Sequence, residues 1–259
     1  MPGDTVAIVS PSWGGPSIFP HVYENGLKVL RNFGLIIKEY PSARAAEEFL
    51  AYNPQARAKD INDAFADIHV KAVFASIGGE DSVRILPFLN KETIRSNPKI
   101  LMGYSDTTTI LSFINQLGIV TFHGPSIMAG FSQVESLPKE FSNHIQQMLF
   151  FPQDCIEYVS FGSYCDGYPD WSNVHNVGKI NELKHDTGWR FIQGNGAVTG
   201  ELYGGCIEVL ESLNGTDFWP EKEFWNGKVL FFETSEENPP CKEFNACFET
   251  TECKVFLTR

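Results

Sequence analysis

A serine in a tight corner between a strand and a helix is the first residue of this chain that suggests chemistry. Ser105 follows the apolar residues 100–102 and precedes a helical pattern of apolar residues that ends at Leu117. Such a corner raises the hydroxyl to a crest, where the helix N-terminus presents free N–H groups to a developing negative charge. The segment GYSDT (residues 103–107) lacks the second glycine of the G-x-S-x-G pattern, and its polar residues also suit a plain helix cap, which is the competing interpretation.

A pair of glycines supplies the second feature of the candidate site. Gly78 and Gly79 end the apolar strand of residues 71–77 and precede Glu80. An unobstructed N–H group here could face the same site as the N–H group of Asp106. Two such donors form an oxyanion hole, in which each donor typically contributes about 3 to 4 kcal/mol of transition-state stabilisation. An ordinary turn followed by the start of a helix would give the same pattern.

Activation of a serine also needs a base and a carboxylate that orients it, and the sequence supplies these unevenly. Glu233 ends the strand of residues 228–232, where a carboxylate could orient an imidazole, although any strand ending in glutamate looks the same. No histidine follows His185 in the sequence. His123, at the end of a short strand, is the histidine nearest the predicted cleft, and we expect it to be a structural, hydrogen-bonded residue.

Strands and helices alternate through the first part of the chain. The strand-like runs are residues 5–9, 35–40, 72–77 and 100–102. Because each parallel crossover needs a helix, this alternation predicts an α/β fold with a parallel sheet covered on both faces. Ligands bind at the carboxyl ends of such strands, so the loops at residues 10–15, 78–82 and 103–106 should converge on one cleft.

A change in composition near residue 150 indicates a second domain. Most of the net charge of −12 falls beyond that point, and residues 162–178 are rich in aromatic and turn-forming side chains. We expect a nucleophile domain over residues 1–150, an inter-domain linker over residues 151–178 and a smaller, strand-richer domain over residues 179–259. An acidic surface repels phosphate backbones and anionic lipids, which argues against nucleic-acid and membrane partners.

The sequence gives no sign of a membrane span, a secretion signal or a metal site. No run approaches the roughly 18 apolar residues of a spanning helix, and the N-terminus lacks a basic, then apolar, leader. The 6 cysteines all lie beyond residue 150, without a C-x-x-C pair or histidines at ligand spacing. We therefore expect reduced thiols, no metal and a cytoplasmic protein.

Five motifs occur in an order that resembles the LD-carboxypeptidase family of serine peptidases, which includes the microcin C self-immunity peptidases. They are IGGEDS, GYSDTT, HGP, GELYGGCIEVLESLNGT and VLFFETSEE. The resemblance spans about residues 2–240. It implies a flavodoxin-like N-terminal domain that carries the nucleophile and a smaller, β-rich C-terminal domain. It also implies a cytoplasmic homodimer that uses neither metal nor cofactor.

The resemblance assigns roles to individual residues. It implies Ser105 as the nucleophile, Glu233 as the triad acid, and the backbone N–H groups of Gly79 and Asp106 as the oxyanion hole. It also implies a triad histidine tens of residues beyond the glutamate. This chain ends 26 residues after Glu233 and has no match for that histidine. We therefore expect a family member that is truncated at its C-terminus.

The resemblance implies the substrate contacts less directly. The GGEDS form of the glycine loop, which contains Glu80 as a candidate contact, favours the microcin-type branch. In that branch an aromatic residue stacks on the nucleobase of the substrate, and Trp171 or Trp189 would take this part. Cys206 stands where family members often carry an asparagine that contacts the substrate.

These features predict a serine-type hydrolase that cleaves an amide bond beside a free carboxylate through an acyl-enzyme on Ser105. The candidate substrates are the L,D-bond of a muropeptide and an aminoacyl-nucleotide of the microcin kind. Two alternatives stay open: a non-catalytic binding protein that has lost the base, and a fragment of a longer active enzyme. Loss of a triad member typically costs about four to six orders of magnitude in turnover, so we expect this chain to be nearly inactive.

Overall fold

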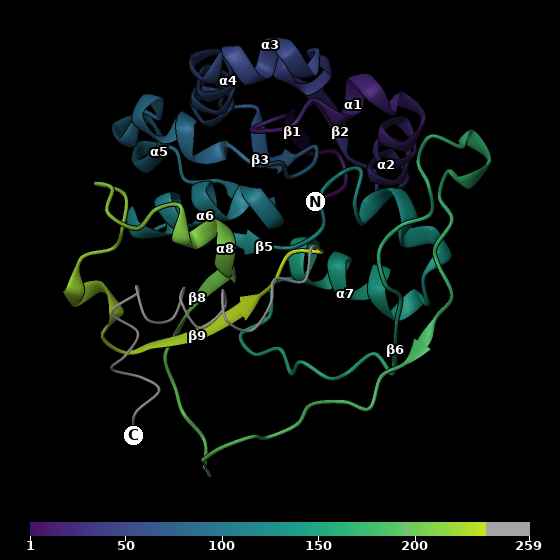
Figure 1. Ribbon diagram of the computed structural model, residues 1–259, viewed down its shortest axis with the longest axis vertical. Coiled ribbons are helices and arrows are strands. Elements are labelled where there is room, and N and C mark those ends of the chain that lie inside the picture. The colour runs from purple at the N-terminus through teal and green to yellow at the C-terminus, as the bar shows by residue number, and fades with distance from the viewer. Residues whose placement is uncertain (195, 237–259) are drawn as a thin grey trace.

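A five-stranded parallel sheet forms the centre of the computed structural model, which describes residues 1–194 and 196–236 (Figure 1). The strand order is β2-β1-β3-β4-β5, and every neighbouring pair is parallel. The strands are β1 (Thr5–Val9), β2 (Ile36–Glu39), β3 (Val70–Ala75), β4 (Ile100–Gly103) and β5 (Phe122–His123). This arrangement confirms the α/β fold predicted from the alternating pattern.

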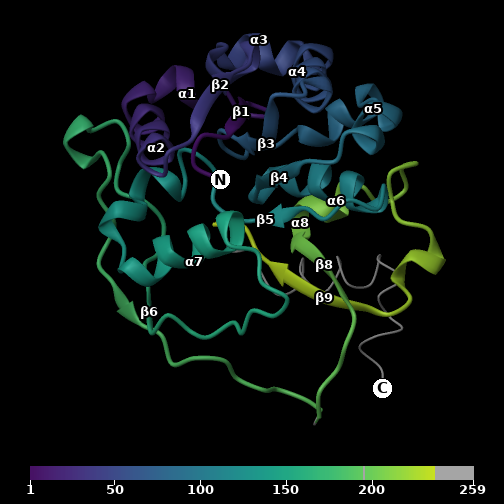
Figure 2. The ribbon, with the colours of Figure 1, turned by 180° about the vertical axis from the view of Figure 1, so that it is seen from behind.

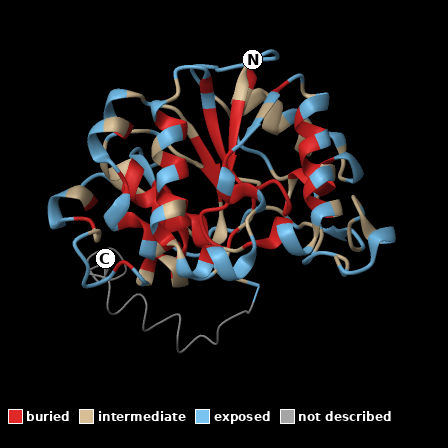
Figure 3. Ribbon diagram, turned by 90° about the horizontal axis from the view of Figure 1, so that it is seen from above, coloured by how far each residue is buried: buried red, intermediate tan, exposed pale blue. Residues whose placement is uncertain are grey.

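Helices cover both faces of this sheet. The α-helices of this part are α1 (Gly15–Ile18), α2 (Pro20–Asn32), α3 (Glu47–Tyr52), α4 (Pro54–Ala66), α5 (Lys91–Ser96), α6 (Thr108–Gln116) and α7 (Lys139–Phe150). The 3-10 helices are η1 (Pro41–Arg44), η2 (Ser82–Phe88), η3 (Ser105–Thr107) and η4 (Phe131–Ser136). In Figure 3 the strands at the centre are buried, and the exposed residues lie on the outer sides of the helices.

The side chains of each central strand alternate between two hydrophobic clusters. Val6 and Ile8 of β1 pack with α2 and α7, whereas Ala7 and Val9 pack with α4 and α6. This is the period of two that a strand with both faces buried requires. The sheet is therefore held between two layers of helices, which fixes where its carboxyl ends point.

The longer helices begin and end at residues suited to those positions. Pro20 and Pro54 stand at the first positions of α2 and α4, where the missing N–H group costs nothing. Gly34, just after α2, has φ of +84°, a conformation that glycine adopts without steric cost. These local signals explain where α2 and α4 begin and where α2 ends.

The second part of the described chain is smaller and richer in strand. It contains the antiparallel pair β6 (Ser163–Tyr164) and β7 (Lys184–His185), the parallel pair β8 (Glu201–Cys206) and β9 (Lys228–Glu233), α8 (Ile207–Glu211), η5 (Val174–Asn176) and η6 (Lys222–Trp225). The chain between α7 and β8 runs along the outside of the molecule (Figures 1 and 2). Two small two-stranded sheets therefore accompany the parallel sheet, in line with the smaller, strand-richer second part that we expected.

The small β8-β9 sheet packs against the central domain through α6. Tyr203, Leu210 and Trp225 belong to the same hydrophobic cluster as Ile110 and Phe113 of α6. The hydroxyl groups of Tyr203 and Ser112 lie 2.6 Å apart in a buried hydrogen bond. Since α6 follows the corner at Ser105, this packing brings the end of β9 near the predicted nucleophile. Within residues 1–194 and 196–236, no helix has both the length and the apolar character needed to cross a membrane.

Candidate active site

Ser105 occupies a strained backbone position at the carboxyl end of β4. Among the described residues other than glycine, it alone has a positive φ, +54°. A left-handed backbone costs an L-residue about 1 to 2 kcal/mol, and such strain is found at sites where function requires a set geometry. The corner also needs Gly103, because a Cβ atom there would lie 2.8 Å from Thr107 Cγ2 and 3.0 Å from Ala75 Cβ. The geometry is that of a nucleophile elbow.

The glycine loop (residues 77–82) lies directly against the Ser105 side chain. A Cβ atom added to Gly78 would be 3.0 Å from Ser105 Oγ and 3.3 Å from the backbone nitrogen of Asp106. Gly79 has φ of +151°, and a Cβ atom there would lie 2.2 Å from Ser12 Oγ. Position 79 therefore requires glycine, and position 78 leaves little room for a larger residue. The structure brings together the serine hydroxyl, the Asp106 nitrogen and the glycine loop.

Hydrogen bonds tie the glycine loop to its surroundings on both sides. The N–H groups of Glu80 and Asp81 donate to the Ser12 hydroxyl at 3.1 and 3.3 Å. The N–H group of Ser82 donates to Oδ2 of Asp106 at 2.8 Å. Burial raises the pKa of the Asp106 carboxyl, and hydrogen bonds from Ser12 and Ser82 offset this only in part. The residue after Ser105 therefore anchors the loop with its side chain.

A buried arginine holds the far side of the glycine loop. Arg57 is fully buried and contacts Asp81 at 2.6 Å, while the exposed Arg84 contacts the same carboxylate at 2.9 Å. Arg57 also donates to the carbonyl of Pro11 at 2.8 Å. Burial alone would raise the pKa of Asp81, but the two guanidinium groups outweigh this and hold the pKa below its usual value. The loop is thus fixed by a charged network that remains ionised at neutral pH.

Glu233 reaches the same site from the second sheet. It ends β9, beside Cys206 in the β8-β9 register, and its side chain is 40% exposed. Its Oε1 lies 3.1 Å from Nε2 of His123. The sequence placed His123 near the cleft but gave no sign of this partner, because the two residues are far apart in the chain and neither lies in a motif with the other.

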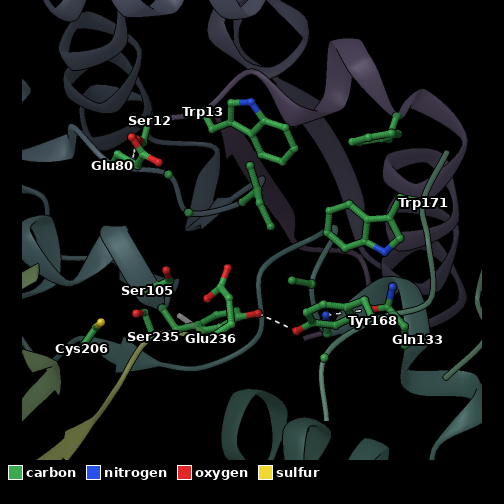
Figure 4. Close-up of a pocket in the computed structure, with 18 of the residues that line it drawn as sticks. Ser12, Trp13, Glu80, Ser105, Gln133, Tyr168, Trp171, Cys206, Ser235 and Glu236 are labelled. Atoms are coloured by element: carbon green, nitrogen blue, oxygen red, sulfur yellow. Dashed lines mark hydrogen bonds between the residues drawn. The ribbon is translucent and has the colours of Figure 1, made fainter. Parts of the chain in front are cut away.

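A cavity of about 1110 Å³ connects Ser105 and the glycine loop with Glu233. Its lining includes the predicted residues Ser105, Glu233, Gly79, Glu80, Trp171 and Cys206. In Figure 4, Ser105, Cys206 and Ser235 lie at one end, and Trp13, Trp171 and Tyr168 lie toward the other. Trp189 is 76% exposed and does not belong to the lining, so of the two candidate tryptophans the structure brings only Trp171 to the cavity.

Aromatic rings and tyrosine hydroxyls form the wall opposite Ser105. The Phe19 ring lies edge-on to both Trp13 and Trp171, with centroid distances of 6.1 and 5.9 Å. The hydroxyl groups of Tyr104 and Tyr168 are 2.6 Å apart, which fastens the loop that carries Tyr168 to the residue before the nucleophile. Trp13 and Phe19 were not singled out in the sequence, where an isolated aromatic residue in a loop carries no signal of its own.

The cavity lining is acidic. Its carboxylates are Glu47, Glu80, Asp81, Asp170, Glu233 and Glu236, and no lysine or arginine of the described residues lines it. Asp81 is neutralised by its arginines, and Glu47 accepts a hydrogen bond from the Trp13 indole at 3.0 Å. The described residues therefore give the cavity lining a negative charge, which favours ligands that carry an ammonium group.

The structure makes Cys206 a neutral packing residue. It is fully buried, and its N–H group donates to the Thr108 hydroxyl at 3.2 Å. Burial, together with the nearby Glu208, raises the pKa of the thiol to about 12. Because the thiolate is the nucleophilic form of cysteine, Cys206 does not compete with Ser105 for that role. In residues 1–194 and 196–236, no group of three or more potential ligand side chains could hold a metal ion.

Comparison with known protein families finds two matches that together cover most of the chain. The LD-carboxypeptidase N-terminal domain matches residues 6–124, and the LD-carboxypeptidase C-terminal domain matches residues 199–251. The first match contains Ser105 and the glycine loop, and the second contains Glu233. The two halves of the candidate site therefore fall within the two domains of one family.

Individual relatives agree with these matches. A putative carboxypeptidase of Vibrio cholerae is 28% identical over 234 residues, which cover 90% of this chain and 68% of the relative. A probable murein peptide carboxypeptidase of Bacillus subtilis is 30% identical over 240 residues, 92% of this chain and 64% of the relative. The microcin C7 self-immunity protein MccF of Escherichia coli is 26% identical, over 91% of this chain and 68% of MccF. The chain thus spans about two thirds of the length of each.

Solved structures share the fold over nearly the whole chain. An MccF-like protein from Streptococcus pneumoniae, in complex with AMP, has a TM-score of 0.87 and 26% identity over 97% of this chain and 78% of its own. An MccF-like protein from Bacillus anthracis has a TM-score of 0.84 and 26% identity over 95% of this chain and 72% of its own. Given the family matches and these shared features, the chain belongs to the LD-carboxypeptidase family.

Proposed function

We propose that this chain is a serine-type hydrolase in which Ser105 is the nucleophile and Glu233 orients the general base. The observation that carries this proposal is the contact between the glycine loop and Ser105. An added Cβ atom on Gly78 would lie 3.0 Å from the hydroxyl oxygen and 3.3 Å from the Asp106 nitrogen, at the wall of a cavity that also holds Glu233. Family membership supports the same reaction class.

The proposed reaction is acyl transfer through a covalent intermediate. Ser105 Oγ attacks the carbonyl carbon of an amide, and its proton passes to the base. The carbonyl oxygen becomes an oxyanion that accepts hydrogen bonds from the N–H groups of Gly79 and Asp106, each contributing about 3 kcal/mol. The C–N bond then breaks, the amine leaves with the proton from the base, and water hydrolyses the ester on Ser105.

The described residues do not place a histidine on the Ser105 hydroxyl. His123 directs Nε2 to Glu233, and its Nδ1 has no hydrogen-bond partner within residues 1–194 and 196–236. In a serine triad the base must lie within hydrogen-bond reach of the hydroxyl. We therefore expect a turnover about four to six orders of magnitude below that of an intact triad.

The cavity suits an aminoacyl-nucleotide or a muropeptide as substrate. The relatives include a murein peptide carboxypeptidase, and the structure of the MccF-like protein from Streptococcus pneumoniae contains AMP. In this chain, Trp171 offers a face on which a nucleobase could stack, and the carboxylates favour a free amino group on the acyl portion. Because the described lining residues include no lysine or arginine, a free carboxylate of the substrate would rely on neutral N–H and hydroxyl donors. We also propose a homodimer, which sedimentation equilibrium can test.

A serine-directed fluorophosphonate tests the nucleophile directly. With imidazole present as the base, we expect one adduct, detected by intact mass and mapped to Ser105, and none in Ser105→Ala. Ser235→Ala is the matched control, since Ser235 lines the same cavity and should leave labelling unchanged. An adduct that persists in Ser105→Ala would refute the proposed nucleophile.

Turnover tests the state of the base. The release of D-alanine from murein tetrapeptide and the hydrolysis of aspartyl-sulfamoyl-adenosine should proceed at nearly the rate of Ser105→Ala. Added imidazole should raise the rate in the unmodified chain only, because Glu233 can orient a diffusible base. A rate above about 1 s⁻¹ without imidazole would show that the chain already holds a working base, since typical enzymes turn over at this rate or faster.

A binding protein without catalysis is the second candidate. It is favoured because, within residues 1–194 and 196–236, no hydrogen bond joins the Ser105 hydroxyl to a base, although Ser105 lines the cavity. This alternative predicts that aspartyl-sulfamoyl-adenosine binds equally to the chain and to Ser105→Ala. It also predicts that imidazole restores nothing and that fluorophosphonate does not label Ser105.

A further inference from the structure

His123 holds the Glu233 carboxylate from the side of the central sheet. The contact is 3.1 Å between His123 Nε2 and Glu233 Oε1, and the two side chains are 20% and 40% exposed. His123 ends β5 and Glu233 ends β9, so this contact links the five-stranded sheet to the two-stranded sheet (Figure 2). It lies where the two halves of the proposed site meet.

Backbone pairing ties His123 to the strand that carries the nucleophile. In the β4-β5 register its Cα atom pairs with that of Gly103, two residues before Ser105. The N–H group of Gly124 donates to the carbonyl of Gly103 at 3.0 Å, which continues the ladder past His123. The position of the imidazole is therefore set by the same strand that sets the position of Ser105.

Two aromatic rings fix the plane of the imidazole. The Tyr104 ring lies edge-on at a centroid distance of 6.3 Å, and the Phe231 ring lies edge-on at 5.5 Å. Tyr104 precedes Ser105, whereas Phe231 lies on β9 with Glu233, so the ring is confined between the two halves of the site. A confined ring directs its two nitrogens along set lines, which is what a positioning contact needs.

The surroundings of the ring select one tautomer. Nδ1 is buried and has no hydrogen-bond partner among the described residues. A proton on Nδ1 would be a buried donor without an acceptor, whereas a proton on Nε2 would face the Glu233 carboxylate oxygen 3.1 Å away. Of the two neutral tautomers, the one with its proton on Nε2 therefore suits this contact and leaves no orphaned donor.

We propose that His123 is a positioning residue for Glu233. Its Nε2–H donates to Oε1 and leaves the other carboxylate oxygen to orient the general base. The proposal rests on the proposed function, because Glu233 must orient a base for its position to affect catalysis. Among the described residues no hydrogen bond joins His123 to the Ser105 hydroxyl, and in this proposal no proton of the reaction passes through His123.

The tautomer can be measured without any catalysis. Long-range proton-nitrogen NMR of the histidine-labelled chain should show His123 with its proton on Nε2 at neutral pH, assigned by the loss of its signals in His123→Gln. In Glu233→Gln this preference should weaken toward a mixture of tautomers. A proton on Nδ1 in the unmodified chain, or a pattern indifferent to Glu233→Gln, would overturn the proposal.

A double-mutant cycle measures the effect on chemistry. The readout is the rate of fluorophosphonate labelling of Ser105 with imidazole present. His123→Leu should lower this rate about 10-fold to 100-fold with unchanged affinity for the probe. His123→Gln, whose amide can donate in place of Nε2, should recover it to within about 3-fold. In a Glu233→Ala background, His123→Leu should have no further effect.

Each result of the cycle bears on the proposal. Full additivity of His123→Leu and Glu233→Ala would overturn it, and so would a His123→Gln rate as low as that of His123→Leu. If His123→Leu fails to fold by circular dichroism, the comparison of His123→Gln with the unmodified chain and the NMR result decide. If Ser105 is never labelled, the proposed function fails, and the NMR measurement alone decides whether His123 holds Glu233.

Discussion

The two halves of the candidate site are held in place by different means. On the nucleophile side, Ser105 lies two residues beyond the end of the buried strand β4, and the adjoining glycine loop is fixed by backbone N–H groups and a buried arginine. On the acid side, Glu233 ends a half-exposed strand of a two-stranded sheet, and its carboxylate meets the central domain through the His123 side chain. The half proposed to form the covalent bond is therefore coupled to folding, and we expect that the half proposed to orient the base can be altered without unfolding the protein.

Removal of Arg57 should have the largest effect on stability. Arg57→Leu leaves the Asp81 carboxylate without its buried partner, and breaking such a pair typically costs about 3 to 5 kcal/mol. We expect the free energy of unfolding, measured with urea, to fall by about 3 kcal/mol. The loss is at the lower end of this range because Asp81 keeps its contact with Arg84 and is partly exposed. Arg84→Ala is the control and should cost less than about 1 kcal/mol, as exposed pairs do. Equal losses in the two variants would contradict the described anchoring of the glycine loop.

A methyl group on the glycine loop should damage the site more than the fold. In Gly79→Ala the new Cβ atom would lie 2.2 Å from Ser12 Oγ, at φ of +151°. Loss of one hydrogen-bond donor to the oxyanion typically lowers turnover by about 100-fold to 1000-fold. We therefore expect fluorophosphonate labelling to slow by at least about 100-fold. Gly215→Ala is the matched control, since its φ is +75° and nothing lies within 4 Å. Its labelling rate should be unchanged, whereas an equal slowing would point to a global effect.

The pH dependence of stability should reveal the contribution of the Asp81 carboxylate, which Arg57 and Arg84 hold beside the glycine loop. The folded pKa of Asp81 lies below its usual value, so its contribution is present above the unfolded pKa, near 4, and is lost as the pH falls through the folded pKa. When the pH is lowered from about 6 to below about 4, the free energy of unfolding should therefore fall less in Asp81→Asn than in the unmodified chain. We expect a difference of about 1 kcal/mol, because the group is partly exposed. Urea unfolding between about pH 3 and 6 measures this difference. If the stabilities of the two proteins fall in parallel as the pH is lowered, the Asp81 carboxylate does not contribute to the loss of stability in acid.

Asp106 should act in the opposite direction. Its folded pKa lies above the usual value, so ionisation is disfavoured by folding, and its contribution falls as the pH rises through the interval between the unfolded and folded pKa values. The two aspartates of one network therefore have opposing signs, and the Asp81 variant must be compared at several pH values rather than at one.

The acid side should show the smallest change in stability. Glu233→Gln keeps the shape of a half-exposed side chain, and surface changes of this kind usually stay within about 0.5 kcal/mol. We expect unfolding to be unchanged within that range, while imidazole no longer restores turnover. A loss of several kcal/mol would show that the second sheet depends on this carboxylate and would remove the contrast between the two halves.

The nucleophile side was largely predictable from the sequence because its signals are local. The strand, the glycine and the helix around Ser105 define the corner, and the rule that parallel strands bind ligands at their carboxyl ends places the glycine loop beside it. The pairing of His123 with Glu233 was not predictable. It depends on how the small sheet packs against α6, which involves residues far apart in the chain and has no sequence period.

The two tryptophans show the same limit. Trp171 and Trp189 both lie in a region without regular alternation, and nothing in the sequence separates them. The structure does: Trp171 packs against Phe19 and lines the cavity, whereas Trp189 is 76% exposed. The domain boundaries at residues 150 and 178 stay predictions.

The left-handed backbone at position 105 bears on how this sequence was selected. Glycine and asparagine accept that conformation with less strain. Selection for folding stability alone would therefore favour them over serine at this position. If Ser105 is the nucleophile, as proposed, a hydroxyl at this sterically costly position reflects a compromise between folding and reactivity. This chain keeps a serine hydroxyl at position 105 although another residue would form the same turn with less strain.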